Sequence, residues 1–191
     1  MSDLLVGIGV VAVGSVIALG LLLHLEKRQA RCDERRSRPA ALRDAELIHI
    51  ERTFRMTNPI PIAAKLDRGY RLPYGQLVLV ELKTRWNGGP NFSDVIQLSA
   101  QRVALSAATG QTVAAEAFVL IARPGVRRSP VAHRVDLLSV DQVVALVWRR
   151  EAILADRISP RYTAEVGHCR GCVFRSPCHG AGGQRRSTAE G

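Results

Sequence analysis

The sequence predicts an α/β fold in which helices flank one central mixed sheet. The predicted order along the body of the chain is a helix, three strands, a helix, two strands and a helix, an α/β mixture that is typical of a protein built around a single sheet. Residues 113–122 are mostly apolar, and the first half of residues 76–85 is apolar on both faces, as in a central strand. With the first 25 residues set aside, roughly 165 remain, which is enough for one core.

The chain opens with a run of twenty residues, 4–23, that contains no charged side chain. Twenty helical residues are about 30 Å long, which matches the hydrocarbon layer of a bilayer. The alternative is a secretory signal peptide, but the positive start and the small-residue cleavage site that it needs are not seen. Residues 1–25 are therefore expected to form one transmembrane helix that anchors the chain.

Basic residues crowd the C-terminal flank of this run, and none precedes it. Because the cytoplasmic flanks of membrane spans carry the Lys and Arg excess, we expect a single-pass membrane protein whose body lies in the cytoplasm. The simpler interpretation of this cluster is contact with lipid headgroups, and the alternative is a role in holding DNA. Its members are Lys27, Arg28, Arg31, Arg35, Arg36 and Arg38.

The whole chain is basic, with 27 Lys and Arg against 17 Asp and Glu, and its net charge is +10. This excess favours a polyanionic partner, either nucleic acid or anionic lipid. The composition does not choose between the two, and no protein partner is indicated.

The first half of the body contains three predicted strands. Residues 26–45 come before them and are predicted to form a basic juxtamembrane helix, broken near Pro39. Apolar and polar residues then alternate, and the turn residues Pro73-Tyr74-Gly75 separate two of the strands. The predicted strands are residues 47–54, 63–72 and 76–85.

The second half begins with a break at residues 87–90, Asn-Gly-Gly-Pro. It contains a predicted helix over residues 92–108, two predicted strands over 113–122 and 131–137, and a last helix. A capping-box sequence at residues 139–142 opens this last helix, which is expected to continue to Asp156. We expect one domain over residues 46–180 and a disordered tail over residues 181–191.

The turn at residues 73–75 brings two acidic residues together. If these three residues form the loop of a hairpin, then Leu72 faces Gln76, and Asp67 faces Glu81 with Cβ atoms about 5 Å apart. Two carboxylates at this distance repel each other unless a cation lies between them. A hard divalent ion such as Mg²⁺ takes one or two carboxylates and completes its shell with water and phosphate oxygens.

Lys83 lies two residues after Glu81, so both side chains are on one face of the strand. An ion in this place would polarise a phosphate and activate a bound water, and Lys83 would orient that water or stabilise the developing charge. In the following helix, Asp94, Gln97 and Gln101 share one face, and Gln97 can reach a substrate beside the metal. An apolar face is predicted for Ile96, Ala100, Val103 and Ala107. The simpler interpretations are a surface ion pair for Glu81 and Lys83, and a solvated side chain for Gln97.

Four cysteines complete the candidate residues. Cys169, Cys172 and Cys178 lie within ten residues near the end of the chain, and Cys32 lies far upstream. In a cytoplasmic protein this spacing favours a metal or a cluster over disulfides. Zinc also suits four thiolates, and His168 or His179 could then replace Cys32.

With these residues the chain resembles a known family, the RecB-like branch of the PD-(D/E)XK nucleases. The resemblance covers about residues 46–178 and implies a restriction-endonuclease-like core that acts on DNA. It implies that Asp67 and Glu81 bind Mg²⁺ or Mn²⁺, that Lys83 is catalytic and that Gln97 belongs to an auxiliary Q-x-x-x-Y motif. The matching positions are Glu51-x-x-Phe54, Lys65-Leu66-Asp67-Arg68, Gly75, the segment LVLVELKT at residues 77–84, and Gln97.

Two positions depart from the pattern of this family. Gln101 stands where the auxiliary motif has tyrosine, and the upstream metal ligand, usually a His or Glu on the first helix, has no clear match. Glu46, His49 and Glu51 are the candidates for this ligand. A degenerate domain that binds DNA or a partner without cleaving is therefore the alternative to a nuclease.

The cysteine pattern is similar to that of the CRISPR-associated iron–sulfur exonucleases of the same family. The similarity implies that Cys32, Cys169, Cys172 and Cys178 hold a [4Fe–4S] cluster. Taken together, these features predict a membrane-tethered exonuclease that uses a divalent ion to cleave DNA at single-stranded ends. A membrane-bound redox or iron–sulfur sensor that uses only the cysteines is a third possibility.

Overall fold

The computed structural model of the chain describes residues 19–22, 24–26, 28–29, 31–86, 88–126, 129–161 and 172–173. The chain divides into two compact units, Met1–Val147 and Trp148–Gly191. The sheet, the helix between its central strands and the candidate site all belong to the first unit.

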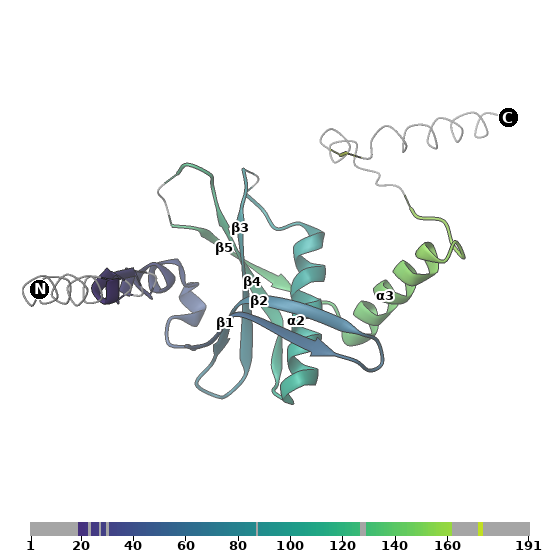
Figure 1. The fold of residues 1–191 in the computed structure, drawn as a ribbon, viewed down its shortest axis with the longest axis horizontal. Coiled ribbons are helices and arrows are strands. Elements are labelled where there is room, and N and C mark those ends of the chain that lie inside the picture. The colour runs from purple at the N-terminus through teal and green to yellow at the C-terminus, as the bar shows by residue number, and fades with distance from the viewer. Residues whose placement is uncertain are drawn as a thin grey trace, which may run out of the picture. The chain divides into compact units, whose positions relative to one another are not determined.

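A five-stranded mixed sheet forms the centre of this unit, in the order β1-β2-β3-β4-β5, so the predicted α/β class is confirmed (Figure 1). The pairs β1–β2, β2–β3 and β4–β5 are antiparallel, and the pair β3–β4 is parallel. The elements are η1 (Ala40–Leu42), β1 (Glu46–Met56), β2 (Ile62–Arg71), β3 (Leu77–Thr84), α2 (Phe92–Thr109), β4 (Val113–Ala122), β5 (Val131–Asp136) and α3 (Val140–Leu154). Each lies within two residues of its predicted bounds where a prediction was made.

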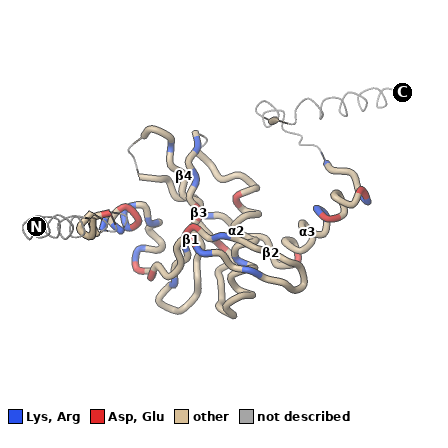
Figure 2. Tube along the Cα trace, viewed as in Figure 1, with Lys and Arg blue, Asp and Glu red and all other residues tan. Residues whose placement is uncertain are grey.

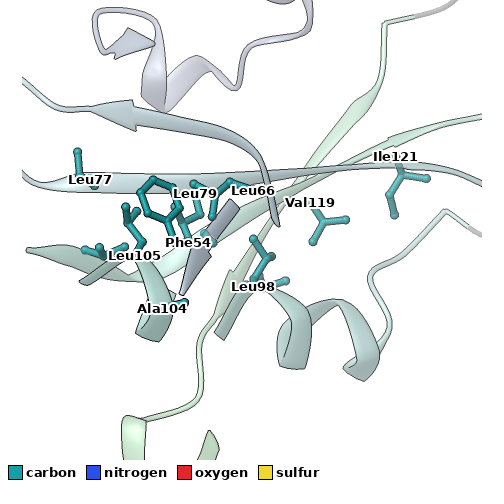
Figure 3. Packing of buried hydrophobic residues seen from close by; sticks show 12 residues of the cluster. Phe54, Leu66, Leu77, Leu79, Leu98, Ala104, Leu105, Val119 and Ile121 are labelled. Atoms are coloured by element: carbon teal, nitrogen blue, oxygen red, sulfur yellow. The ribbon is translucent and has the colours of Figure 1, made fainter. Parts of the chain in front are cut away.

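Helix α2 makes the crossover from β3 to β4, because two parallel neighbours need a long connection. It covers one face of the sheet, where Leu77 and Leu79 of β3 pack with Leu98 and Leu105 of α2 (Figure 3). The alternate residues of β3, Val78 and Val80, are also buried, on the opposite face. Burial on both faces explains why the first half of β3 is a continuous apolar run.

The hairpin between β2 and β3 has the register that the sequence predicts. Arg71 pairs with Leu77 and Arg68 pairs with Val80, and the amide of Leu72 donates to the carbonyl of Gln76 at 2.9 Å. Gly75 closes the loop with φ +91°, a conformation that favours glycine over any residue with a Cβ atom. Continued by one step, the register places Asp67 opposite Glu81.

The helical segment that ends at Ser37 is held on the face of the sheet opposite α2. Glu34 accepts two hydrogen bonds of 2.9 Å from Arg38 and one of 2.6 Å from the hydroxyl of Tyr70. Burial alone would raise the pKa of Glu34, but the bonds from Arg38 and Tyr70 outweigh it and lower the pKa. Burial and this carboxylate together raise the pKa of Tyr70 to about 12.

The expected membrane span and the expected tail fall on parts of the chain that the structure does not describe. Residues 4–18 of the span and residues 181–191 lie outside the described residues. Within the residues that are described, no helix has both the length and the apolar character needed to cross a bilayer. The predicted juxtamembrane helix is observed as helical residues up to Ser37, with the break expected near Pro39 followed by the short η1.

Candidate active site

The candidate site lies where β2 and β3 separate. Their observed pairing ends at Arg68 and Val80, one step before Asp67 and Glu81. Beyond this point the side chain of Asp67, rather than the backbone of β2, bonds to β3. Its Oδ2 accepts a hydrogen bond of 2.8 Å from the amide of Leu82. This bond fixes Asp67 beside the end of β3 and leaves its other oxygen, Oδ1, without a bond in the described region.

Glu81 is the most deeply buried acid of the site, with 2% of its surface exposed. An ionised carboxylate in such a place needs hydrogen-bond donors or a cation. Its Oε1 accepts from the ammonium of Lys83 at 2.8 Å and from the amide of Gln97 at 2.6 Å. Its Oε2 accepts from the amide of Gln101 at 2.8 Å. Both oxygens of Glu81 therefore have partners.

Lys83 and Gln97 form a closed triangle with Glu81. The ammonium of Lys83 also donates to Oε1 of Gln97 at 2.8 Å, so each of the three side chains contacts the other two. Lys83 supplies the positive charge that the buried carboxylate requires, and it remains a quarter exposed, with 26% of its side chain accessible. The lysine can thus exchange its carboxylate partner for another anion without leaving the site.

Gln101 corrects the prediction for α2. The sequence pattern placed the apolar face at Ile96, Ala100, Val103 and Ala107, but Ala107 is exposed, whereas Gln101 has 1% of its surface exposed. The face that packs on the sheet carries polar residues because they have partners there. The amide of Gln101 donates to Glu81 and, at 2.8 Å, to the carbonyl of Lys65 in β2.

Gln101 therefore links all three elements of the site. Its amide nitrogen lies between β2 and β3, at the position where direct pairing between these strands has ended. Its Oε1 is buried and has no hydrogen-bond partner among the described residues. The sequence pattern placed Gln101 on one helical face with Asp94 and Gln97, at the position of the auxiliary tyrosine, and its spacing of four residues after Gln97 was the available signal for its role.

A second buried pair fixes the start of α2 against the end of β3. Arg85 contacts both oxygens of Asp94, at 3.3 and 2.5 Å, and donates to the carbonyl of Gly89 at 2.9 Å. Burial raises the pKa of Asp94, but the bonds from Arg85 and from the amide of Asn91 outweigh it, so the pKa is lowered. Asp94 also completes the capping box of α2 with Asn91. These contacts set the position of Gln97 one turn later.

The three candidates for an upstream metal ligand are placed apart. Glu46 is exposed and lies 3.7 Å from Arg71. His49 is buried edge-on against Phe54, its ring nitrogens have no partner among the described residues, and burial lowers its pKa. In the described part of the chain no three metal-ligating side chains gather at one point.

Glu51 has the most unusual backbone of the three candidates. Its φ of +49° lies in the left-handed region, which costs a residue other than glycine of order 1–3 kcal/mol. Its neighbours pair with Arg68 and Leu66, so Glu51 stands opposite Asp67 in the β1–β2 register. Its side chain is exposed and forms an ion pair with Lys65. The backbone of Glu51 thus lies opposite that of Asp67, but its carboxylate is paired with Lys65 and not with the acidic residues of the site.

The residues present fit a hard divalent ion held by few protein ligands. Asp67 and Glu81 provide carboxylate oxygens, the ligands that Mg²⁺ and Mn²⁺ prefer, and two carboxylates with water and phosphate complete such a shell. The ion would be held by a free oxygen of Asp67 and by Glu81, whose Oε1 would then exchange the ammonium of Lys83 for it. Such a site suits hydrolysis of a phosphodiester.

Comparison with known proteins gives the family. The family model of the PD-(D/E)XK nuclease superfamily matches residues 16–179. The chain belongs to this superfamily, whose name denotes nucleases, that is, hydrolases of phosphodiester bonds. Nucleases of this superfamily typically use Mg²⁺ or Mn²⁺.

One solved structure that the chain resembles is the crystal structure of SSO0001, at 21% sequence identity and a TM-score of 0.45. The match covers 82% of this chain and 66% of that one, so this chain spans slightly less than two thirds of the other's length. No curated protein sequence matches the chain.

Two of the four cysteines lie in the described part of the chain. Cys32 and Cys172 are both exposed there, and neither forms a disulfide. Cys169, Cys178, His168 and His179 lie outside the described residues.

Gln101→Met tests whether Gln101 holds the site together. The substitution keeps the shape of the side chain but removes the donor to Glu81 and Lys65, so we expect a loss of about 1–3 kcal/mol in the free energy of unfolding. Urea denaturation measures this loss, and Mn²⁺ titration should show weaker binding because Glu81 is no longer fixed. Gln29→Met is the matched control, because Gln29 is exposed on the helical segment before β1, so its loss should cost less than about 0.5 kcal/mol. Equal losses in the two variants would contradict the role of Gln101.

Proposed function

We propose that the chain is a nuclease that cleaves DNA with Mg²⁺ or Mn²⁺. The observation that carries the proposal is the cluster of Glu81, Lys83 and Gln97, with Asp67 fixed beside it at the point where β2 and β3 part. A surface ion pair would not explain why Glu81 is 2% exposed and has three donors. The choice of DNA, and of single-stranded ends as the point of attack, rests on the resemblance to the RecB-like branch.

The proposed reaction assigns a task to each side chain. Asp67 and Glu81 would hold the ion, which would supply polarisation of the scissile phosphate and a bound water of lowered pKa as the nucleophile. Lys83 would exchange Oε1 of Glu81 for the phosphate oxygens or the attacking water, where its charge would stabilise the transition state. Gln97 keeps Lys83 in position through the bond of 2.8 Å between Oε1 and the ammonium. Gln101 holds the second oxygen of Glu81 throughout.

Asp67→Ala and Lys83→Ala should each reduce Mg²⁺-dependent cleavage of DNA by about 100-fold or more, because each removes a metal ligand or a donor to the transition state. The assay follows loss of an end-labelled oligonucleotide with Mg²⁺, with Mn²⁺ and with EDTA. Asp141→Ala is the matched control, because Asp141 is an exposed aspartate in the first turn of α3. Circular dichroism confirms that each variant is folded.

Two results would argue against this reaction. Cleavage that survives in both variants, or that continues in EDTA, would show that this cluster is not the active site. Binding of DNA by the wild-type chain with no cleavage under any divalent ion would favour the degenerate DNA-binding tether.

We also propose that the four cysteines bind a [4Fe–4S] cluster, with zinc as the alternative. Exposed thiols at Cys32 and Cys172 are available as ligands, and Cys32 lies in the first unit, on the helical segment before β1. The spacing of Cys169, Cys172 and Cys178 supports the proposal, since three thiolates within ten residues suit a cluster or a zinc ion.

Protein purified without oxygen should be brown, with broad absorption in the visible region, if the cluster is present. Cys172→Ser should remove this absorption, because a [4Fe–4S] cluster needs its thiolate ligands. Iron and zinc analysis of the same samples separates the two metals. A colourless protein that contains about one zinc per chain would overturn the cluster, and metal-free protein would overturn both.

A membrane anchor at residues 1–25 completes the proposal. It is supported by the uncharged run at residues 4–23 and by the basic residues that follow it. The proposal places the nuclease unit at the cytoplasmic surface of the membrane.

Two positions near the centre of the uncharged run, Gly14 and Val16, allow the anchor to be tested. The double substitution Gly14→Arg/Val16→Arg should move the chain from the membrane fraction to the supernatant, since each central arginine costs about 2.5–3.5 kcal/mol of insertion free energy. Sedimentation after carbonate washing measures the distribution. Wild-type chain in the supernatant would contradict the anchor.

A further inference from the structure

We propose that an arginine-lined groove before β1 binds the sugar–phosphate backbone of a nucleic-acid strand and leads it toward the active site. The groove has a volume of about 1020 Å³ and lies between the helical segment that ends at Ser37 and the start of β1. It is called the arginine groove below, and its basic members are Arg28, Arg31, Arg35, Arg36, Arg38 and Arg43. The proposal rests on the proposed function and adds a substrate-binding site to it.

One wall of the arginine groove is fixed by hydrogen bonds. Arg38 is bound to both oxygens of Glu34, and its Nη1 donates to the carbonyls of Arg43 and Ala45 at 3.2 and 2.7 Å. The guanidinium also lies 5.0 Å from the ring centre of Tyr70. Arg38 thus has a structural role, and the groove keeps its shape without a ligand.

The other five arginines have no acidic partner among the described residues. Two acidic residues of the described chain line the groove, and each is engaged: Glu34 by Arg38 and Glu46 by Arg71. All five arginines are exposed. Five guanidinium groups around one groove repel one another, and a polyanion removes this repulsion. These five are Arg28, Arg31, Arg35, Arg36 and Arg43.

Three of the arginines share one side of the helical segment. Arg28, Arg31 and Arg35 are spaced three and four residues apart, which places them on one face of a helix. Figure 2 shows basic residues along this segment and the turn before β1. A guanidinium binds phosphate through two parallel hydrogen bonds, so a row of arginines suits a chain of phosphates.

The floor of the groove is apolar. Leu47 and Ile50 of β1 line it, and 62% of the surface of Ile50 is exposed. A nucleic-acid strand presents phosphates on one side and bases on the other, so its phosphates would meet the arginines while its bases cover this floor.

The groove and the active site lie on opposite faces of the sheet, near its β1 edge. Ile50 pairs with Arg68, the neighbour of Asp67, and Arg68 in turn donates to the hydroxyl of Ser37 at 2.8 Å. Strand β1 is at the edge of the sheet, so a polymer can pass from the groove over this edge to Asp67. A nucleic-acid strand can occupy both places at once. A lipid headgroup fills only the groove, and this difference favours the nucleic acid.

The test compares two variants that lose the same charge. Arg31→Gln/Arg35→Gln/Arg36→Gln removes three arginines from the groove, and Arg149→Gln/Arg150→Gln/Arg157→Gln removes three from the second unit. Both are made in the full chain that carries Asp67→Ala, so that binding is measured without cleavage. The probe is a fluorescein-labelled oligothymidylate of 20 nucleotides, followed by anisotropy from 50 to 200 mM salt.

We expect the groove variant to bind at least tenfold more weakly and to lose about 2 from the slope of log K against log salt, at about 0.7 for each phosphate contact. The control variant should keep the slope of the parent chain. With Asp67 restored, the groove variant should cleave with a raised KM and a kcat close to that of the wild type.

Three results separate this inference from the proposed function. Equal binding by the two variants, with cleavage still dependent on Asp67, would overturn the groove and leave the nuclease. Weaker binding in the groove variant, with no cleavage by the wild type, would support the groove and overturn the reaction. Reduced association with vesicles of phosphatidylcholine and phosphatidylserine, but unchanged oligonucleotide binding, would assign the groove to lipid and overturn the inference.

Discussion

The site depends on the burial of one carboxylate at the end of an apolar strand. Strand β3 is covered on both faces up to Val80, so Glu81 reaches a place from which water is largely excluded. A charge in such a place requires compensation. Lys83, Gln97 and Gln101 provide it, and a divalent ion would provide more. The side chains that surround Glu81 are thus explained by a single electrostatic requirement.

The rest of the first unit keeps these side chains in register. The tight turn at Gly75 fixes β2 against β3, and the separation of the two strands after Arg68 leaves Asp67 free to bond the end of β3 with its side chain. The contact between Arg85 and Asp94 fixes α2 at the level where its glutamines reach Glu81. On the other face, Glu34 and Arg38 hold the helical segment that forms the arginine groove. The proposed substrate groove and the candidate active site are therefore attached to the two faces of one hairpin.

The sequence was sufficient for elements whose signals are local. Strand alternation, the Pro73-Tyr74-Gly75 turn and the acidic pair beside Lys83 predicted the sheet and the β2–β3 register, which the structure confirms. It was not sufficient for the buried face of α2. Hydrophobicity assigned that face to Ile96, Ala100, Val103 and Ala107, because the partners of Gln101 come from strands far away in the sequence. The hydrogen bonds that Arg38 and Tyr70 donate to Glu34 were not predicted for the same reason, although Glu34 and Arg38 are four residues apart, a spacing typical of helical ion pairs.

The most direct test of the central claim is a crystal structure with Mn²⁺, in which anomalous scattering locates the ion. We expect one ion bonded to carboxylate oxygens of both Asp67 and Glu81 at about 2–2.5 Å, with the ammonium of Lys83 moved from Oε1 of Glu81 but still on the same side of the sheet. An ion bound elsewhere, or Asp67, Glu81 and Lys83 pointing apart, would contradict this claim.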